Sequence, residues 1–255
     1  MLQQTQAARV VSVYEAFIRR FPSVTSLAAA SRRDVLRAWD GLGYHRRAVA
    51  LSEGARIVVR DQDGHLPCDP AALRRLPGVG PYTSAAVASI AFGVPIAAVD
   101  TNVRRIVARL HLGVEADDAS PRDVAEIANA WLDPRDPGRW NQALMDLGRE
   151  VCRPRPRCDA CPLAAECRFV AAGLPLRPAR RKQDSFRGST REVRGAIVRA
   201  LRAHESLSIG RLVAETGFAR ERVVPAVSAL AGEGIVAAGP AAVAESPRGR
   251  VWLAE

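Results

Sequence analysis

The chain has 255 residues, of which 48% are hydrophobic and 25% charged, enough to build the core of one large or two modest domains. Its 37 Lys and Arg residues outnumber its 27 Asp and Glu residues by 10. A positive excess of this size favours a polyanionic partner, nucleic acid first and an anionic membrane second. An arginine-rich solvated surface with no such partner is the alternative. No run approaches ~20 apolar residues, which argues against a membrane span. The first six residues do not form a signal peptide, so we expect a cytoplasmic protein.

The first sixty residues show helical periodicity. Ser31, followed three residues later by Asp34, predicts a capped helix that ends at Gly41 and Gly43. Two further sets of apolar residues recur at helical spacing and predict buried helix faces on either side of it. They are Val10, Val13, Tyr14, Phe17, Ile18 and Phe21 in the first set, and Ala48, Leu51, Ala55, Val58 and Val59 in the second.

Helical patterns continue to about residue 151. They cover residues 70–75, 83–91, 102–110 and 140–151, and Ser120 with Pro121 and Asp123 marks one more helix start. No alternating strand pattern precedes residue 170. The sequence therefore predicts an all-α first domain over residues 1–172.

The last third of the chain changes in composition. Residues 173–189 are polar and contain Pro175, Pro178 and Lys182, the sole lysine of the chain, so we interpret them as a linker. Residues 190–255 show helices near 192–203, 211–215 and 220–232, and 235–255 is expected to form a small hairpin. Three helices and a hairpin predict a winged-helix-like C-terminal module.

Four of the five cysteines lie close together in the sequence, at Cys152, Cys158, Cys161 and Cys167. In a cytoplasmic protein such a group favours a metal site over disulfides. Thiolates ligate zinc and iron–sulfur clusters alike, so the spacing alone leaves both open. Cys68 stands apart and is expected to be a buried, inert thiol.

The string Leu76-Pro77-Gly78-Val79-Gly80-Pro81-Tyr82-Thr83 lies between two predicted helices. Its glycines permit positive φ angles, so successive backbone N–H groups can converge on one phosphate beside a helix N-terminus. A tight turn with no ligand is the alternative. Asp100 precedes the next predicted helix, where an aspartate is more often a plain N-cap.

Several of these strings together resemble the helix-hairpin-helix glycosylases of the endonuclease III superfamily, and most closely their adenine-specific (MutY-like) branch. The resemblance covers about residues 1–170. It is carried by the hairpin, by the segment from Asp100 to Arg105, by Met145–Gly148 with the cysteine loop, and by two strings nearer the start, Leu2–Gln6 and Gly41–Tyr44. It implies the helix-hairpin-helix glycosylase fold.

The resemblance also implies roles for single residues. It places a [4Fe–4S] cluster on the four cysteines of loop 152–167, although the first gap holds five residues where the family usually has six. It makes Asp100 the catalytic carboxylate, helped by Asn102. Tyr82 stands where bifunctional relatives carry a Schiff-base lysine, so we predict a monofunctional hydrolase; a plain core aromatic is the alternative for Tyr82.

Contacts to double-stranded DNA are implied for two regions. In the hairpin they fall on Leu76, Gly78, Val79, Gly80, Tyr82 and Thr83. Near the start of the chain, Gln4 and Tyr44 are expected to wedge into the duplex beside an extruded base, with Gln3 and Thr5 adjacent. Ordinary surface glutamines are the alternative.

The implied function is base-excision repair of adenine opposite guanine or 8-oxoguanine, by a monomer in the cytoplasm at the nucleoid. The family's catalytic glutamate lies two residues before the position of Met1 and is not in this chain, so we expect a chain truncated relative to the family that binds DNA better than it cleaves it. The 65 or so residues after the linker are too few for the family's Nudix-like domain. A thymine or uracil mismatch glycosylase and a catalytically inactive DNA-binding protein remain as alternatives.

Overall fold

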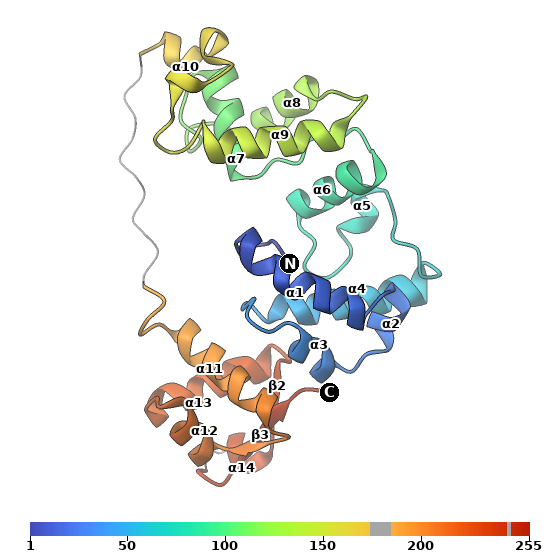
Figure 1. Ribbon diagram of the computed structural model, residues 1–255, viewed down its shortest axis with the longest axis vertical. Helices are drawn as coiled ribbons and strands as arrows, with labels where there is room; N and C mark the ends of the chain where they lie inside the picture. Colours follow the sequence, from blue (N-terminus) through green and yellow to red (C-terminus); the bar gives the residue numbers. More distant parts are fainter. Residues whose placement is uncertain (174–184, 244–245) are drawn as a thin grey trace. The chain divides into compact units, whose positions relative to one another are not determined.

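The computed structural model describes residues 1–173, 185–243 and 246–255 (Figure 1). The chain divides into two compact units: Met1–His65 with Lys182–Glu255, and Leu66–Arg181. Lys182 itself lies outside the described residues. Each unit has its own hydrophobic core. Within the described part of the chain, no helix combines the length and the apolar character needed to cross a membrane.

The first unit begins with four helices, α1 (Ala7–Arg20), α2 (Val24–Ala29), α3 (Arg32–Ala38) and α4 (Arg46–Asp61). The predicted cap of α3 is confirmed, because the Ser31 side chain accepts a hydrogen bond from the Asp34 N–H. The chain then turns through Gly41 and Gly43, both at positive φ. Helix α2 packs on α4, and Arg56 of α4 donates to the carbonyls of Ala28 and Ala30 at the end of α2.

Some predicted inward residues of this unit are exposed. Val10 and Phe17 of α1 are buried as predicted, but Tyr14 and Ile18 are 53% and 44% exposed. In α4, Leu51 is 40% exposed. The apolar stripe of each helix is thus wider than the face that packs against the core, and the prediction for these side chains was wrong.

The C-terminal part of the first unit is a mixed module. It contains α11 (Thr190–Ala203), β1 (Leu207–Ser208), α12 (Ile209–Thr216), α13 (Arg220–Gly232), β2 (Val236–Ala238), α14 (Pro240–Val243) and β3 (Arg250–Leu253). Strand β3 lies between β1 and β2 and is antiparallel to both. The predicted hairpin is confirmed as β2 and β3, with Val236 opposite Leu253, and β1 adds a strand that the sequence did not predict.

This module and the first four helices share one core, in which Val35 and Trp39 of α3 pack in the same cluster as Ile197 and Leu253. Polar contacts join the same elements, since Arg202 forms an ion pair with Asp40. The predicted domain boundaries at residues 172 and 190 stay a prediction. The structure adds that residues 185–255 belong to the same compact unit as α1–α4.

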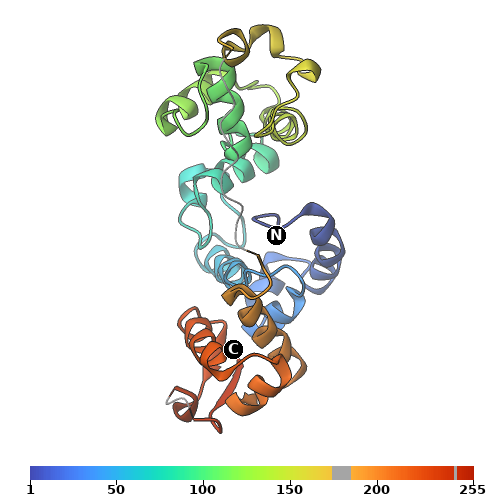
Figure 2. The same cartoon turned by 90° about the vertical axis from the view of Figure 1, so that its left-hand side faces the viewer.

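The described residues of the second unit form helices joined by turns and loops, with no strand among them, as predicted for residues before 170 (Figure 2). It contains α5 (Pro70–Leu73), α6 (Pro81–Phe92), α7 (Thr101–Val107), α8 (Pro121–Trp131), α9 (Pro137–Glu150) and α10 (Arg168–Ala171). A π-helical turn, Ala108–Leu112, continues α7. Helix α9 packs against both α6 and α7, and the core lies between α7, α8 and α9. The whole described chain is therefore mostly helical with one small sheet.

Candidate active site and metal centre

The predicted hairpin joins α5 to α6. Leu73 and Leu76 are buried and anchor it, and the Val79 N–H closes a turn on the Leu76 carbonyl at 3.2 Å. Gly78 has φ 74°, a conformation that favours glycine, and Gly80 is the N-cap of α6. The side chain of Leu76 is buried, so any contact of this residue with DNA falls to its backbone. The helix–turn–helix geometry of the prediction is confirmed, whereas DNA binding by these residues stays a prediction.

Asp100 caps α7. Its Oδ1 accepts hydrogen bonds from the Asn102 N–H at 2.8 Å and the Val103 N–H at 2.7 Å, and its Oδ2 accepts from Asn102 Nδ2 at 3.0 Å. The plain N-cap role is therefore present. These three bonds also hold the half-buried carboxylate in one orientation at the positive end of the helix.

The hairpin helix brings Tyr82 into the electrostatic reach of Asp100. Burial, followed by the negative charge of Asp100, raises the pKa of Tyr82. Its hydroxyl lies 3.5 Å from Met145 Sδ of α9, and the residue is 37% exposed, so it is not a plain core aromatic. The three predicted catalytic residues thus lie on two neighbouring helix starts of one unit, and the phenol keeps its proton at neutral pH.

A residue that the sequence did not single out supports Asn102. Arg105 Nη2 donates to Asn102 Oδ1 at 2.8 Å and to the Gly148 carbonyl at 2.7 Å, and Arg105 Nε donates to the Cys152 carbonyl at 2.6 Å. The side chain therefore connects Asp100, through Asn102, to the first cysteine of the loop. Charge-assisted bonds of this kind are about twice as strong as neutral ones, so Arg105 is well suited to hold Asn102 in place.

Asn141 is a second residue that the sequence analysis did not identify, and it forms hydrogen bonds with the segment that precedes Asp100. It is fully buried, and its Nδ2 donates to Ser89 Oγ, the Ile96 carbonyl and the Pro137 carbonyl at 2.9 to 3.0 Å. Its Oδ1 accepts from the Ala98 N–H at 2.7 Å. A buried amide that is hydrogen-bonded at both its nitrogen and its oxygen gives a unique arrangement to its neighbours, and here these are α6, α9 and residues 96–98.

The cysteine loop follows α9 through two short 3-10 turns, Cys158–Ala160 and Ala164–Glu166. All four predicted cysteines line one small cavity together with Arg109 and Phe169. Four thiols around one cavity fit the donor set of a zinc ion or a [4Fe–4S] cluster. Over the described residues, no three His, Cys, Asp or Glu side chains meet at one metal-binding point. Cys68, predicted to be buried, is exposed.

Arg109, which lies in the π-helical turn, contacts residues at both ends of this loop. It is 3% exposed and forms an ion pair with Glu115 at 2.9 Å. Its Nη1 donates to the Arg153 carbonyl at 2.8 Å and lies 3.8 Å from Cys152 Sγ. The Cys167 thiol donates to the Arg109 carbonyl at 3.6 Å. A buried positive charge beside the thiols suits a site whose ligands are thiolates.

The predicted wedge residues lie in the other unit, on two neighbouring loops. Gln3 and Gln4 are exposed, and Tyr44 is 44% exposed. The Thr5 hydroxyl donates to the Leu42 carbonyl at 3.3 Å, which joins the loop of residues 1–5 to that of residues 42–44. The structure therefore brings these four residues of the prediction into one surface region.

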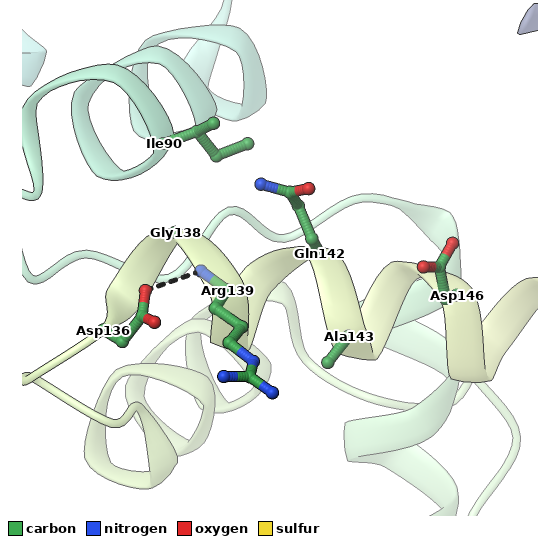
Figure 3. A pocket seen from close by; sticks show the side chains of 7 residues that line it. All are labelled: Ile90, Asp136, Gly138, Arg139, Gln142, Ala143 and Asp146. Carbon is green, nitrogen blue, oxygen red and sulfur yellow. Dashed lines mark hydrogen bonds between the residues drawn. The ribbon is translucent and has the colours of Figure 1, made fainter.

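A shallow pocket between α6 and α9 lies apart from all predicted residues. It is lined by Ile90, Asp136, Gly138, Arg139, Gln142, Ala143 and Asp146. Figure 3 shows Gln142 pointing toward Ile90 and the Asp136 carboxylate bonded to the backbone of Arg139, a helix cap at 3.0 Å. Asp136 is used as this cap and Asp146 forms an ion pair with Arg149 at 3.1 Å, so both acids of the pocket already have partners.

Comparisons with known proteins show which family this chain matches. Residues 1–134 match the family described as HhH-GPD superfamily base excision DNA repair protein. A protein of Mycobacterium tuberculosis named adenine DNA glycosylase is 46% identical over 211 residues, 80% of this chain and 68% of that protein.

Two solved structures are similar in fold. A thermostable thymine-DNA glycosylase has a TM-score of 0.63 at 29% identity and covers 67% of this chain and 80% of its own. An endonuclease III in a trapped covalent complex with DNA has a TM-score of 0.59 at 26% identity and covers 68% of this chain and 82% of its own.

Proposed function

The chain belongs to the adenine DNA glycosylases of the HhH-GPD superfamily of base excision DNA repair proteins, and from this we propose that it hydrolyses the N-glycosidic bond of adenine mispaired with guanine or 8-oxoguanine. The observation that carries the proposal is the carboxylate of Asp100, held by three hydrogen bonds at the start of α7. It lies close enough to Tyr82 of the hairpin helix for its charge to raise that pKa.

The chemistry follows from the charge that develops on the sugar. Breaking an N-glycosidic bond creates an oxocarbenium-like centre at C1′, and a fixed carboxylate stabilises that cation or adds to it. Because α7 and Asn102 already orient Asp100, little reorganisation is needed when the charge appears. In this proposal Asn102 has a second part, which is to position the sugar or the attacking water.

We propose a monofunctional hydrolase. A lyase step needs an amine that forms a Schiff base with the sugar, and the hairpin offers the phenol of Tyr82 in its place. The raised pKa keeps that phenol protonated at neutral pH, so it can donate a hydrogen bond. A phenol has no amine nitrogen, so it cannot form an imine in either protonation state. The one lysine, Lys182, lies outside the described residues.

The partner in this proposal is double-stranded DNA with a mismatch or an oxidised guanine. The backbone N–H groups around Gly78 and Gly80, with the N-terminus of α6, suit a phosphate of that duplex. Gln4 and Tyr44 fill the space left by the extruded base. The solved complex of the similar endonuclease III with DNA supports this partner. We infer that the protein acts as a monomer in the cytoplasm, at the nucleoid.

For the cysteine loop we propose a [4Fe–4S] cluster, held by Cys152, Cys158, Cys161 and Cys167. When bound, such a group cross-links the loop through four thiolate ligands. Arg105 connects Cys152 of that loop to Asn102, so the position of the loop bears on the position of Asn102. For residues 190–255 we propose a winged-helix-like fold, which the order α11, β1, α12, α13, β2, α14, β3 supports.

An excision assay tests the proposal. Duplexes with one adenine opposite guanine, adenine opposite 8-oxoguanine, or thymine opposite guanine are incubated with the full chain. We expect abasic sites from both adenine duplexes, with strand breaks only after alkali. Excision of thymine but not adenine would replace the proposal by the thymine alternative, and tight binding without excision of any base would favour the inactive DNA-binding protein.

A further inference from the structure

Two loops of the first unit carry strained backbone conformations. Gln4 has φ 54° and Tyr44 has φ 46°, in the left-handed region that residues other than glycine seldom adopt. Both side chains are exposed. Strain of this kind persists only where the surrounding structure holds it, and it is concentrated at sites of function. Contacts from the rest of the first unit must therefore hold these two loops.

One guanidinium, that of Arg47 in α4, bonds to both. Toward residues 1–5, its Nη1 donates to the Met1 carbonyl at 2.6 Å and to the Gln3 carbonyl, and its Nη2 donates to Thr5 Oγ1 at 2.8 Å. Toward residues 42–44, Nη2 donates to the carbonyls of Leu42 at 3.0 Å and Gly43 at 3.3 Å. Five acceptors from two separate loops thus converge on one side chain.

Two aromatic rings lie close to the same guanidinium. Its central carbon lies 5.4 Å from the centre of the Trp39 ring and 5.6 Å from that of Tyr44. Trp39 is 1% exposed, and its Nε1 donates to the Gly43 carbonyl at 3.1 Å. Arg47 Nε is buried without a hydrogen-bond partner in the described structure. Only an arginine presents this planar fork and stacks on rings, so lysine is no substitute.

We propose that Arg47 is a positioning residue for base extrusion, whose guanidinium holds the loops of residues 1–5 and 42–44 together so that Gln4 and Tyr44 enter the duplex as one preformed wedge. The inference rests on the proposed function, in which these two residues contact DNA. A wedge that is ordered before binding loses less conformational entropy when it displaces a base. Removal of Arg47 therefore affects extrusion more than attachment to DNA.

The test uses the full chain with Asp100→Asn as the parent, which prevents excision. The probe is 2-aminopurine at the target position opposite guanine, whose fluorescence rises when it leaves the base stack. The variants are Arg47→Lys, which keeps the charge but loses the fork, and Arg47→Gln. Arg46→Gln is the matched control, since it removes the same charge from the adjacent, exposed position of α4.

For duplex that is fully bound, we expect Arg47→Lys to lower the extruded fraction relative to the stacked one about tenfold, the effect of losing one or two charge-assisted hydrogen bonds. Arg47→Gln and Arg46→Gln should weaken binding to matched duplex equally, whereas only Arg47→Gln loses the fluorescence rise. Thr5→Val, which removes one acceptor and keeps the fold, should lower extrusion in the same direction by a smaller factor.

Two results would overturn the inference. If Arg47→Lys and Thr5→Val both match the parent in fluorescence, the wedge does not depend on Arg47. Should the Arg47 variants fail to fold, Thr5→Val alone decides. If the parent itself gives no fluorescence rise on the mismatch and the wild-type chain excises no adenine, the proposed function fails together with the inference. Excision by the wild type with unchanged extrusion in the variants defeats the role of Arg47 alone.

Discussion

Gly148 lies in α9 where that helix passes the start of α7. A Cβ atom added there would stand 2.6 Å from Asn102 Cβ and 3.2 Å from Asn102 Cα. Neither neighbour is the end of a flexible side chain, so rotation cannot relieve the overlap. We predict that Gly148→Ala pushes Asn102, and with it the carboxylate of Asp100, away from the positions that their hydrogen bonds define.

The size of the effect follows from two opposing contributions. Alanine in a helix interior is favoured over glycine by about 0.5–1 kcal/mol. Overpacking in a closely packed region costs about 1–3 kcal/mol. The cost of the overlap should exceed the gain in helix propensity, so the free energy of unfolding should fall by about 1 kcal/mol and the Tm by roughly 2–4 °C. Because a displacement of about 1 Å in a catalytic group can cost about 100-fold in rate, activity should fall far more than stability.

Thermal unfolding by circular dichroism and single-turnover excision of adenine measure the two effects. Gly195→Ala in α11 is the matched control, because nothing lies within 4 Å of its added Cβ. That variant should gain about 0.5–1 kcal/mol and keep the wild-type rate. A Gly148→Ala protein that is as stable and as fast as the Gly195→Ala protein would refute the argument from close approach.

Three further predictions concern other parts of the molecule. Asn141→Ala leaves the buried Ala98 N–H and the part-buried Ile96 carbonyl without this partner and should cost about 2–5 kcal/mol in urea unfolding. Cys161→Ser should abolish the visible thiolate-to-iron absorption of purified protein, which Cys68→Ser retains; equal absorption in both would contradict the ligand set. Burial, then the positive charges of Arg202 and Arg194, lowers the pKa of His45 to about 4 from 6.5. As the pH falls, the unfolded chain protonates this histidine before the folded protein does. The contribution of neutral His45 to the free energy of unfolding is therefore fully present above pH 6.5 and is lost between pH 6.5 and pH 4, by up to about 3 kcal/mol. His45→Gln should remove this pH dependence.

Local features of the chain could be predicted from the sequence. Ser31 and Ser120 cap helices as predicted, each accepting from the backbone three residues later. The glycine turn at Gly78 and the hairpin of β2 and β3 also match. Caps and turns depend on residues within four positions of one another, so the sequence alone contains the information that determines them.

Contacts between distant residues could not be predicted. Asn141, Arg105 and Gly148 each look ordinary in their own helices, and their importance comes from partners more than forty residues away. Strand β1 has two residues, too few for any periodic pattern. Tyr14 and Ile18 fit a helical stripe, but the spacing does not reveal how wide a face the neighbouring helices cover.

The two roles of Asp100, as helix cap and as catalytic carboxylate, are compatible because they use different lone pairs. A carboxylate offers about four acceptor positions. Two N–H groups of α7 take Oδ1, and Asn102 Nδ2 takes one position on Oδ2, which leaves one for a developing sugar cation. Asp100→Asn keeps the N-cap through its single oxygen but removes the charge and the Oδ2 acceptor of Asn102 Nδ2. We therefore predict a loss of about 0.5–1.5 kcal/mol in the free energy of unfolding together with a loss of adenine excision of at least about 100-fold. Equal excision by the two proteins would leave Asp100 as a helix cap alone.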